Sequence, residues 1–203
     1  MCVRMHLNQL DKIDPAAVAQ LLGSRFDAVS TDGVRALEEL NLPPDAAILD
    51  VGTGSGNFAI FLASQGYRVL TGEPATDTSQ YSGRDWAPSA EKVGVRDRIR
   101  FQHFDAGDLP FASGSFDAVF FFGVLHHIPE PQRPRVLSEA LRVAKQNGAV
   151  VFLEPRAEML RRVRVDDPAH PEAADPSAYV TGVREQRIEG VLMDTYIFRK
   201  SAA

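Results

Sequence analysis

ILDVGTGSG, at residues 48–56, is the stretch of sequence that decides the fold of this chain. A short apolar run ends in an acid, and three glycines then follow at every second position. Residues 57–63 have the spacing of an amphipathic helix, so the segment predicts a buried parallel strand that turns tightly into a helix. Because Gly52, Gly54 and Gly56 lack a Cβ, a small nucleotide-like ligand can lie directly on the backbone, in front of the helix amides.

The spacing of the glycines distinguishes between nucleotide ligands. A dinucleotide fingerprint has the order G-x-G-x-x-G, whereas this chain has G-x-G-x-G with Asp50 two residues before it. An acid at this position suits a ligand with a cationic amino-acid end and would repel a pyrophosphate. With Glu73 at the end of the next predicted strand, the pattern resembles motif I of the class I S-adenosylmethionine-dependent methyltransferases. The resemblance implies S-adenosyl-L-methionine as cofactor.

The resemblance also implies roles for individual residues. A carboxylate at Glu73 can accept hydrogen bonds from both ribose hydroxyls, although a solvated loop acid before Pro74 is the alternative. Asp105 stands where the family's acid accepts a hydrogen bond from the adenine amine, and Ala106 stands where a backbone amide meets a ring nitrogen. The expected cofactor-binding residues are Asp50, Gly52, Thr53, Gly54, Gly56, Glu73, Pro74, Asp105, Ala106 and Phe122.

Further predicted elements extend this resemblance over roughly residues 46–155. Residues 116–122 predict a strand buried on both faces, followed by an amphipathic helix over 134–144 that Asn147-Gly148 would end. Residues 149–155 predict a fifth strand. In order, these segments look like those of the small-molecule "type 11" methyltransferases. The implied fold is α/β, a Rossmann-like, doubly wound and mostly parallel seven-stranded sheet with a C-terminal antiparallel strand pair.

Two adjacent histidines, His126 and His127, follow the fourth predicted strand at the sheet edge where ligands bind in open α/β folds. Histidine suits proton transfer near neutrality, so both are candidate catalytic residues on the substrate side. In the alternative interpretation the pair begins a helix and one ring bonds only backbone. Enzymes that methylate exocyclic amines of DNA bases carry Asn or Asp followed by Pro-Pro-Tyr here, and the sequence Phe-Phe-Gly-Val disfavours that activity.

Charge, cysteine content and the lengths of the apolar runs exclude some classes of binding partner and cellular location. The net charge of −5 disfavours a nucleic-acid partner, and Cys2 is the one cysteine, so we expect neither a disulfide framework nor a metal site. The first 20 residues lack the apolar core of a signal peptide and no run is long enough to span a membrane, so we expect a cytoplasmic protein. A basic cluster is either a solvated helix face or a site for an acidic substrate; it comprises Arg156, Arg161, Arg162 and Arg164.

We expect a single domain over residues 1–203. Its N-terminal helical segment, residues 1–45, has predicted helices over 15–22 and 32–40, capped by Asp14 and Thr31. This segment either folds over the cofactor or packs against the sheet. The cofactor-binding core is residues 46–155, and a C-terminal helix, loop and edge strands fill residues 156–203, with strands over 183–188 and 195–199.

The segment at residues 74–88 is longer than the usual link of the family and carries the single tryptophan, Trp86. This side chain either covers the ligand or anchors the helix that follows.

The function we expect is an S-adenosylmethionine-dependent methyltransferase that moves a methyl group to a small-molecule acceptor. One alternative is a non-catalytic regulatory module that binds S-adenosylmethionine. Another is an NAD-dependent oxidoreductase, which the glycine spacing and Asp50 disfavour. The sequence leaves the acceptor and the oligomeric state open.

Overall fold

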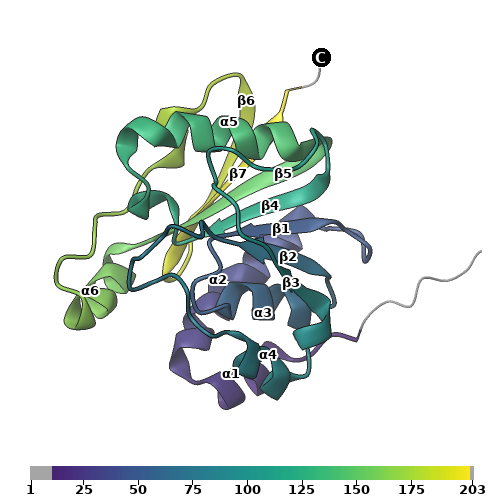
Figure 1. The fold of residues 1–203 in the computed structure, drawn as a ribbon, viewed down its shortest axis with the longest axis vertical. Helices are drawn as coiled ribbons and strands as arrows, with labels where there is room; N and C mark the ends of the chain where they lie inside the picture. Colours follow the sequence, from purple (N-terminus) through teal and green to yellow (C-terminus); the bar gives the residue numbers. More distant parts are fainter. Residues whose placement is uncertain (1–10, 202–203) are drawn as a thin grey trace, which may run out of the picture.

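A computed structural model describes residues 11–201 as one twisted sheet between two layers of helices (Figure 1). The seven strands have the order β3-β2-β1-β4-β5-β7-β6. The strands are β1 (Ile48–Val51), β2 (Val69–Gly72), β3 (Ile99–Phe101), β4 (Phe116–Phe122), β5 (Ala144–Pro155), β6 (Val183–Ile188) and β7 (Met193–Lys200). The α-helices are α1 (Pro15–Leu22), α2 (Ser24–Leu40), α3 (Asn57–Ser64), α4 (Ala87–Val93), α5 (Arg133–Val143) and α6 (Ala157–Asp166).

The sheet is parallel from β3 to β5 and antiparallel where β7 joins β5 and β6. Strand β1 pairs with β2 on one side and with β4 on the other, so the connections diverge there. In open α/β sheets, a ligand crevice forms at such a point, outside the carboxyl ends of the strands. The doubly wound, Rossmann-like sheet and its C-terminal antiparallel pair are confirmed.

Alternate residues of the central strands pack into different helix layers. Ile48 and Phe120 pack with α1 to α4, whereas Leu49 and Phe121 pack with α5. Figure 1 shows these two layers on opposite faces, with α6 at the end of the sheet. Burial on both faces explains why β1 and β4 are almost continuously apolar in sequence. None of the helices within residues 11–201 is long and apolar enough to cross a membrane.

The N-terminal helices agree with the prediction except at the start of α2. Helix α1 has the predicted bounds, and the Asp14 side chain caps it by accepting a hydrogen bond from the amide of Ala16 at 3.0 Å. Helix α2 begins at Ser24 instead of residue 32, so the prediction that Thr31 is its cap is wrong. Gly23, with a φ of +88°, separates the two helices.

The predicted stop at Asn147-Gly148 is also wrong, because α5 ends at Val143 and the pair lies inside β5. The register between β4 and β5 shifts near Phe116, and the backbone of β4 approaches Gly148 closely there. A Cβ on Gly148 would lie 3.0 Å from the carbonyl oxygens of Phe116 and Asp117. The glycine therefore serves strand pairing at an irregularity and does not end the helix.

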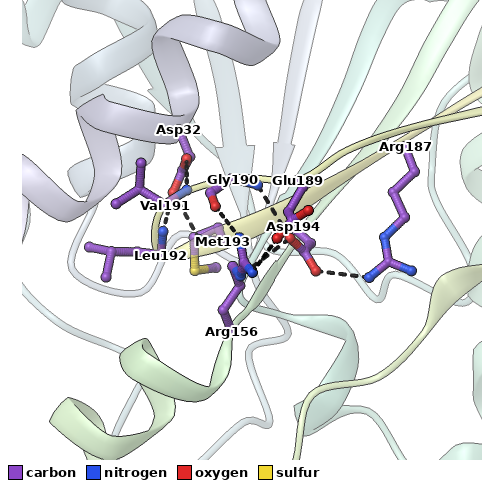
Figure 2. A network of polar contacts seen from close by, with 9 residues as sticks. All are labelled: Asp32, Arg156, Arg187, Glu189, Gly190, Val191, Leu192, Met193 and Asp194. Carbon is purple, nitrogen blue, oxygen red and sulfur yellow. Dashed lines mark hydrogen bonds and ion pairs between the residues drawn. The ribbon is translucent and has the colours of Figure 1, made fainter.

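Asp32, a buried residue of α2, connects the turn between β6 and β7 to the helix layer through hydrogen bonds (Figure 2). Its carboxylate accepts hydrogen bonds at 2.7–2.8 Å from the backbone amides of Val191, Leu192 and Met193. Figure 2 also shows Arg156 beside this turn, donating to the carbonyl of Gly190. The N-terminal segment and the C-terminal hairpin are thereby joined across the sheet end.

Candidate active site

A cavity of about 750 Å³ lies at the carboxyl ends of the parallel strands. Its wall includes every expected cofactor-binding residue except Asp50 and Gly56, and also both candidate histidines. The lining residues that the sequence predicted are Gly52, Thr53, Gly54, Glu73, Pro74, Asp105, Ala106, Phe122, His126 and His127. The volume is within the range of small-molecule sites.

The Glu73 carboxylate is the buried acid of this cavity. Its Oε2 accepts a hydrogen bond from the amide of Gly54 at 3.0 Å, and its Oε1 accepts one from the amide of Gly83 at 2.6 Å. The interpretation of Glu73 as a solvated loop acid is therefore wrong. One side chain connects the glycine turn after β1 with the link after β2, and each oxygen keeps a lone pair for a ligand hydroxyl.

Asp50 lies beneath the cavity wall and not in it. Its Oδ2 accepts a hydrogen bond from the Thr71 hydroxyl at 2.7 Å, whereas its buried Oδ1 has no hydrogen-bond partner. Burial raises the pKa of Asp50 to about 7, and the charge of Glu73 adds to this shift. We expected Asp50 to contact the cationic end of a ligand directly. Asp50 does not line the cavity, so the structure does not show it in a position for that contact.

Gly56 also lies outside the lining, and the reason is Trp86. A Cβ on Gly56 would lie 2.5 Å from the Cβ of Trp86, so the glycine at the start of α3 admits the tryptophan. Trp86 is buried, does not line the cavity, and has the guanidinium of Arg96 over its ring at 4.6 Å. These contacts support its interpretation as an anchor for α4.

Asp105 and Ala106 line the cavity after β3, on the far side of Glu73 from the glycine turn. The Asp105 side chain is exposed, and its Oδ1 accepts a hydrogen bond from the amide of Gly107 at 2.6 Å. This bond holds the turn and leaves the other carboxylate oxygen available. Asp108 pairs with Asp105 as an isolated bridge.

The two candidate histidines lie in a 3-10 turn, Leu125–His127, directly after β4. His126 is buried, and its Nδ1 lies 2.8 Å from Oε2 of Glu154, so it does more than bond backbone. His127 is exposed, with its ring 4.8 Å from that of Tyr81. Partial desolvation of its ring by the surrounding side chains, together with the neighbouring histidines, lowers the pKa of His127 to about 4.

Sequence analysis missed four residues of this region: Tyr81, Glu154, Asp167 and His170. Glu154 had a signal, because it is an acid directly after the apolar run at residues 149–153. His170 had none, because it reaches the cavity through the loop after α6, 44 residues from His126. Tyr81 comes from the long link after β2 and approaches His170 through a hydrogen bond of 3.0 Å.

The basic cluster of α6 is paired with carboxylates. Arg161 and Arg162 bind Glu158 at 2.5 and 3.0 Å, and Arg164 binds Glu172 at 2.7 Å. These exposed pairs fit the solvated helix face, although Arg162 also lines the cavity.

The described part of the N-terminal segment lies in the helix layer of α3 and reaches the cavity. Helices α1 and α2 pack on α3, and Ser24 and Val29 of α2 line the cavity.

The cavity residues fit S-adenosylmethionine. A buried carboxylate stands after β2 and an exposed one after β3, as donors on a ribose and an adenine require. Between β1 and α3, the position that a Cβ of Gly54 would take has only the carbonyl of Tyr81 within 4 Å, at 3.4 Å. A ligand can therefore lie on this turn.

Known proteins match this chain in sequence. The family model described as "Methyltransferase domain" matches residues 49–152, about half of the chain. The 27-O-demethylrifamycin SV methyltransferase of Amycolatopsis mediterranei (strain S699) is 32% identical over 127 residues, which cover 57% of this chain and 45% of that protein. The demethylmenaquinone methyltransferase of Clavibacter sepedonicus is 35% identical over 118 residues, covering 57% and 44%. The chain thus spans about half the length of the curated relatives it matches.

Solved structures share the fold. A SAM-dependent methyltransferase from Aquifex aeolicus superposes with a TM-score of 0.57 at 19% identity, over 92% of this chain and 98% of that one. The PH0226 protein from Pyrococcus horikoshii OT3 gives 0.61 at 18% identity, over 86% and 90%. From the matched family model, with the fold and the cavity in agreement, the chain belongs to the class I S-adenosylmethionine-dependent methyltransferase family.

Proposed function

We propose that this chain transfers the methyl group of S-adenosylmethionine to a small-molecule acceptor bound in the same cavity. One observation carries the proposal: the same cavity is lined by the glycine turn and Glu73 and also by His127, His170 and Met159. The first set suits the cofactor. The second set, from the turn after β4 and from the C-terminal segment, is left for the acceptor.

In this proposal the chain positions the cofactor through several elements. Glu73 accepts the ribose hydroxyls, Asp105 and the Ala106 amide take the adenine edge, and the backbone at Gly54 supports the amino-acid end. When bound, the cofactor supplies a sulfonium methyl group, which a nucleophile attacks in line as the carbon–sulfur bond breaks. The protein's main task is to align the acceptor and exclude water.

His127 is the proposed contact to the acceptor. Because its pKa lies well below 7, the ring is neutral at physiological pH and carries a free nitrogen lone pair. It can accept a hydrogen bond from an acceptor hydroxyl and orient the oxygen. A low pKa makes it a weak base, so we assign His127 to positioning.

The remaining expectations belong to this proposal. They are a single domain whose residues 156–203 complete the acceptor side, a small-molecule acceptor in place of nucleic acid, and a cytoplasmic location. The net charge of −5 supports the second of these.

The test is turnover with candidate acceptors. The names of the two relatives above indicate a rifamycin and a demethylmenaquinone as substrates, so a panel of quinols, phenols and hydroxylated polyketides is the starting set. The assay measures release of S-adenosylhomocysteine, with Glu73→Gln as a control that lacks the proposed ribose carboxylate. Acceptor-dependent release by the wild type supports the proposal. A protein that binds S-adenosylhomocysteine but methylates no member of the panel supports the regulatory-module alternative.

A further inference from the structure

Three histidine side chains meet at the acceptor side of the cavity. His126 and His127 come from the turn after β4, and His170 comes from the loop after α6. One ring nitrogen from each lies within 4.8 Å of the other two. His126 and His170 are buried, His127 is exposed, and all three line the cavity.

The proton on His126 is fixed by Glu154. The two oxygens of this buried carboxylate accept hydrogen bonds from the backbone amides of Leu125 at 3.1 Å and Ala174 at 3.2 Å. Its Oε2 also lies 2.8 Å from Nδ1 of His126. A carboxylate in this position is an acceptor, so Nδ1 of His126 carries the hydrogen and Nε2 keeps its lone pair.

Tyr81 and Asp167 determine which ring nitrogen of His170 carries the hydrogen. The Tyr81 hydroxyl donates its hydrogen to Oδ2 of Asp167 and lies 3.0 Å from Nδ1 of His170. Oδ2 of Asp167 is 3.2 Å from the same nitrogen. The Tyr81 oxygen and Oδ2 of Asp167 can therefore both accept a hydrogen bond from Nδ1 of His170, so Nδ1 carries the hydrogen. Nε2 of His170, like Nε2 of His126, keeps its lone pair.

The two lone pairs are aimed at one another, since Nε2 of His126 and Nε2 of His170 are 3.2 Å apart. Two acceptors at this distance repel unless a cation lies between them. Two nitrogen ligands bound tetrahedrally to zinc at their usual distance are ~3.3 Å apart, close to the spacing seen here.

We propose that His126, His127 and His170 bind a divalent transition-metal ion of the zinc type. Nε2 of His126 and of His170 supply two ligands, and a ring nitrogen of His127, within 4.8 Å of ligand atoms of the other two histidines, supplies the third. Glu154 and Asp167 orient the two buried rings and balance the charge of the ion, as carboxylates behind metal-bound histidines do. We expected no metal site because the sequence has no cysteine cluster. The three histidines were not recognised as a set, because His170 reaches the other two only through the fold.

Three imidazoles leave at least one coordination position open in a zinc-type site. Because His127 and His170 line the cavity, that position faces the space proposed for the acceptor. An oxygen of the acceptor is the ligand that this position suits. With the ion bound, the lone pair of His127 is a metal ligand, so the contact of the acceptor oxygen with the ion replaces its hydrogen bond to His127. A metal-bound hydroxyl loses its proton more readily than a free one. The metal site does not depend on the proposed methyl transfer and is tested without it.

The test is titration of chelator-treated protein with Co²⁺ alone, in the absence of S-adenosylmethionine. We expect one Co²⁺ per chain, with the visible absorption of a low-symmetry nitrogen site, and displacement of that signal by Zn²⁺. Uptake below one equivalent, or a spectrum no different from aqueous Co²⁺, would overturn the proposal. Methyl transfer plays no part in this readout, so the failure of either proposal can be recognised separately.

Variants locate the site. His127→Gln changes an exposed ring and His170→Gln a buried one, and we expect both to weaken Co²⁺ binding by more than tenfold. Asp167→Asn changes a carboxylate behind the ligand and should weaken binding about 10–100-fold. His103→Gln is the control, because His103 is exposed and outside the cavity lining. Equal affinity in His103→Gln and His127→Gln proteins, with both shown folded by circular dichroism, would contradict the assignment.

Discussion

Asp50 is an acid that the fold keeps away from water. Its folded-state pKa of about 7 lies above the ordinary value of 3.8, because burial disfavours the charged form. Between these values the folded protein binds more protons than the unfolded chain, so the stability contribution of Asp50 falls as pH rises through this window. The free energy of unfolding therefore contains a cost at pH 8 that is absent near pH 4.

Asp50→Asn removes this titration and keeps the shape of the side chain. From pH 5 to pH 7 the wild type should lose stability that the variant keeps. The free energy of unfolding of the variant should therefore rise relative to that of the wild type, by up to about 1.4 kcal/mol per pH unit. Urea denaturation across this range measures it. Parallel pH profiles for the two proteins would show that Asp50 titrates normally.

Glu73 joins a structural role to the proposed ribose contact. Glu73→Gln replaces an acceptor-only group with one that has a single acceptor oxygen, so a charged hydrogen bond worth about 1.5–3 kcal/mol is weakened. We expect the affinity for S-adenosylhomocysteine to fall about 10–100-fold by calorimetry. Glu91→Gln, on the exposed surface of α4, is the matched control. A loss within error would leave Glu73 only its bonds to Gly54 and Gly83.

Gly54 has a φ of +49° and lines the cavity. Gly54→Ala places a methyl group where the cofactor is proposed to lie, and we expect S-adenosylhomocysteine binding to weaken tenfold or more. The backbone cost of a left-handed alanine, about 1–2 kcal/mol, must be separated from this effect.

Gly94→Ala provides that separation. Gly94 has a φ of +80°, nothing lies within 4 Å of a Cβ built on it, and it is outside the cavity lining. The two alanine variants should lose similar stability in thermal unfolding, and only Gly54→Ala should lose affinity. If both bind equally well, the ligand does not approach the glycine turn.

At the scale of elements, α2 and the β6–β7 hairpin depend on Asp32 (Figure 2). Its buried side chain accepts hydrogen bonds from the amides of Val191 and Leu192 in the turn. It also accepts one from Met193, the first residue of β7, which lines the cavity. Removing the Asp32 carboxylate alone would leave these backbone N–H donors without an acceptor.

We therefore expect Asp32→Ala to lower the free energy of unfolding by about 2–4 kcal/mol. The comparison is Glu39→Ala, an exposed acid on the same helix, which should change it by less than about 0.5 kcal/mol. Chemical denaturation monitored by circular dichroism measures both. Similar effects from the two variants would show that the turn does not depend on Asp32.

Element boundaries show what sequence patterns can predict. Strand β4 and helix α1 have the predicted bounds, because a run buried on both faces and a capped helix are local signals. The start of α2 escaped prediction because its first turns contain Asp and Ser, and Asp32 is buried through contacts to residues about 160 positions later. The wrong prediction that Gly148 ends α5 also has a non-local cause. A glycine is needed there because the backbone of β4, distant in sequence, lies too close for a side chain.

At the scale of the whole molecule, most residues proposed to hold the cofactor were predictable from the sequence, whereas on the proposed acceptor side only His126 and His127 were. Gly54, Glu73 and Asp105 follow parallel strands, and the carboxyl ends of those strands meet at one edge. Tyr81 and His170 lie on long connections whose paths no local pattern determines, so their approach to His126 appears only in the folded chain.

The central claim is that this cavity binds S-adenosylmethionine, and calorimetric titration with S-adenosylhomocysteine, with NAD as the control ligand, tests it most directly. We expect 1:1 binding of S-adenosylhomocysteine in the micromolar range, about −8 kcal/mol, and no heat of binding with NAD. Binding of NAD alone would contradict the cofactor assignment, and binding of neither ligand by the folded protein would contradict the enzyme proposal.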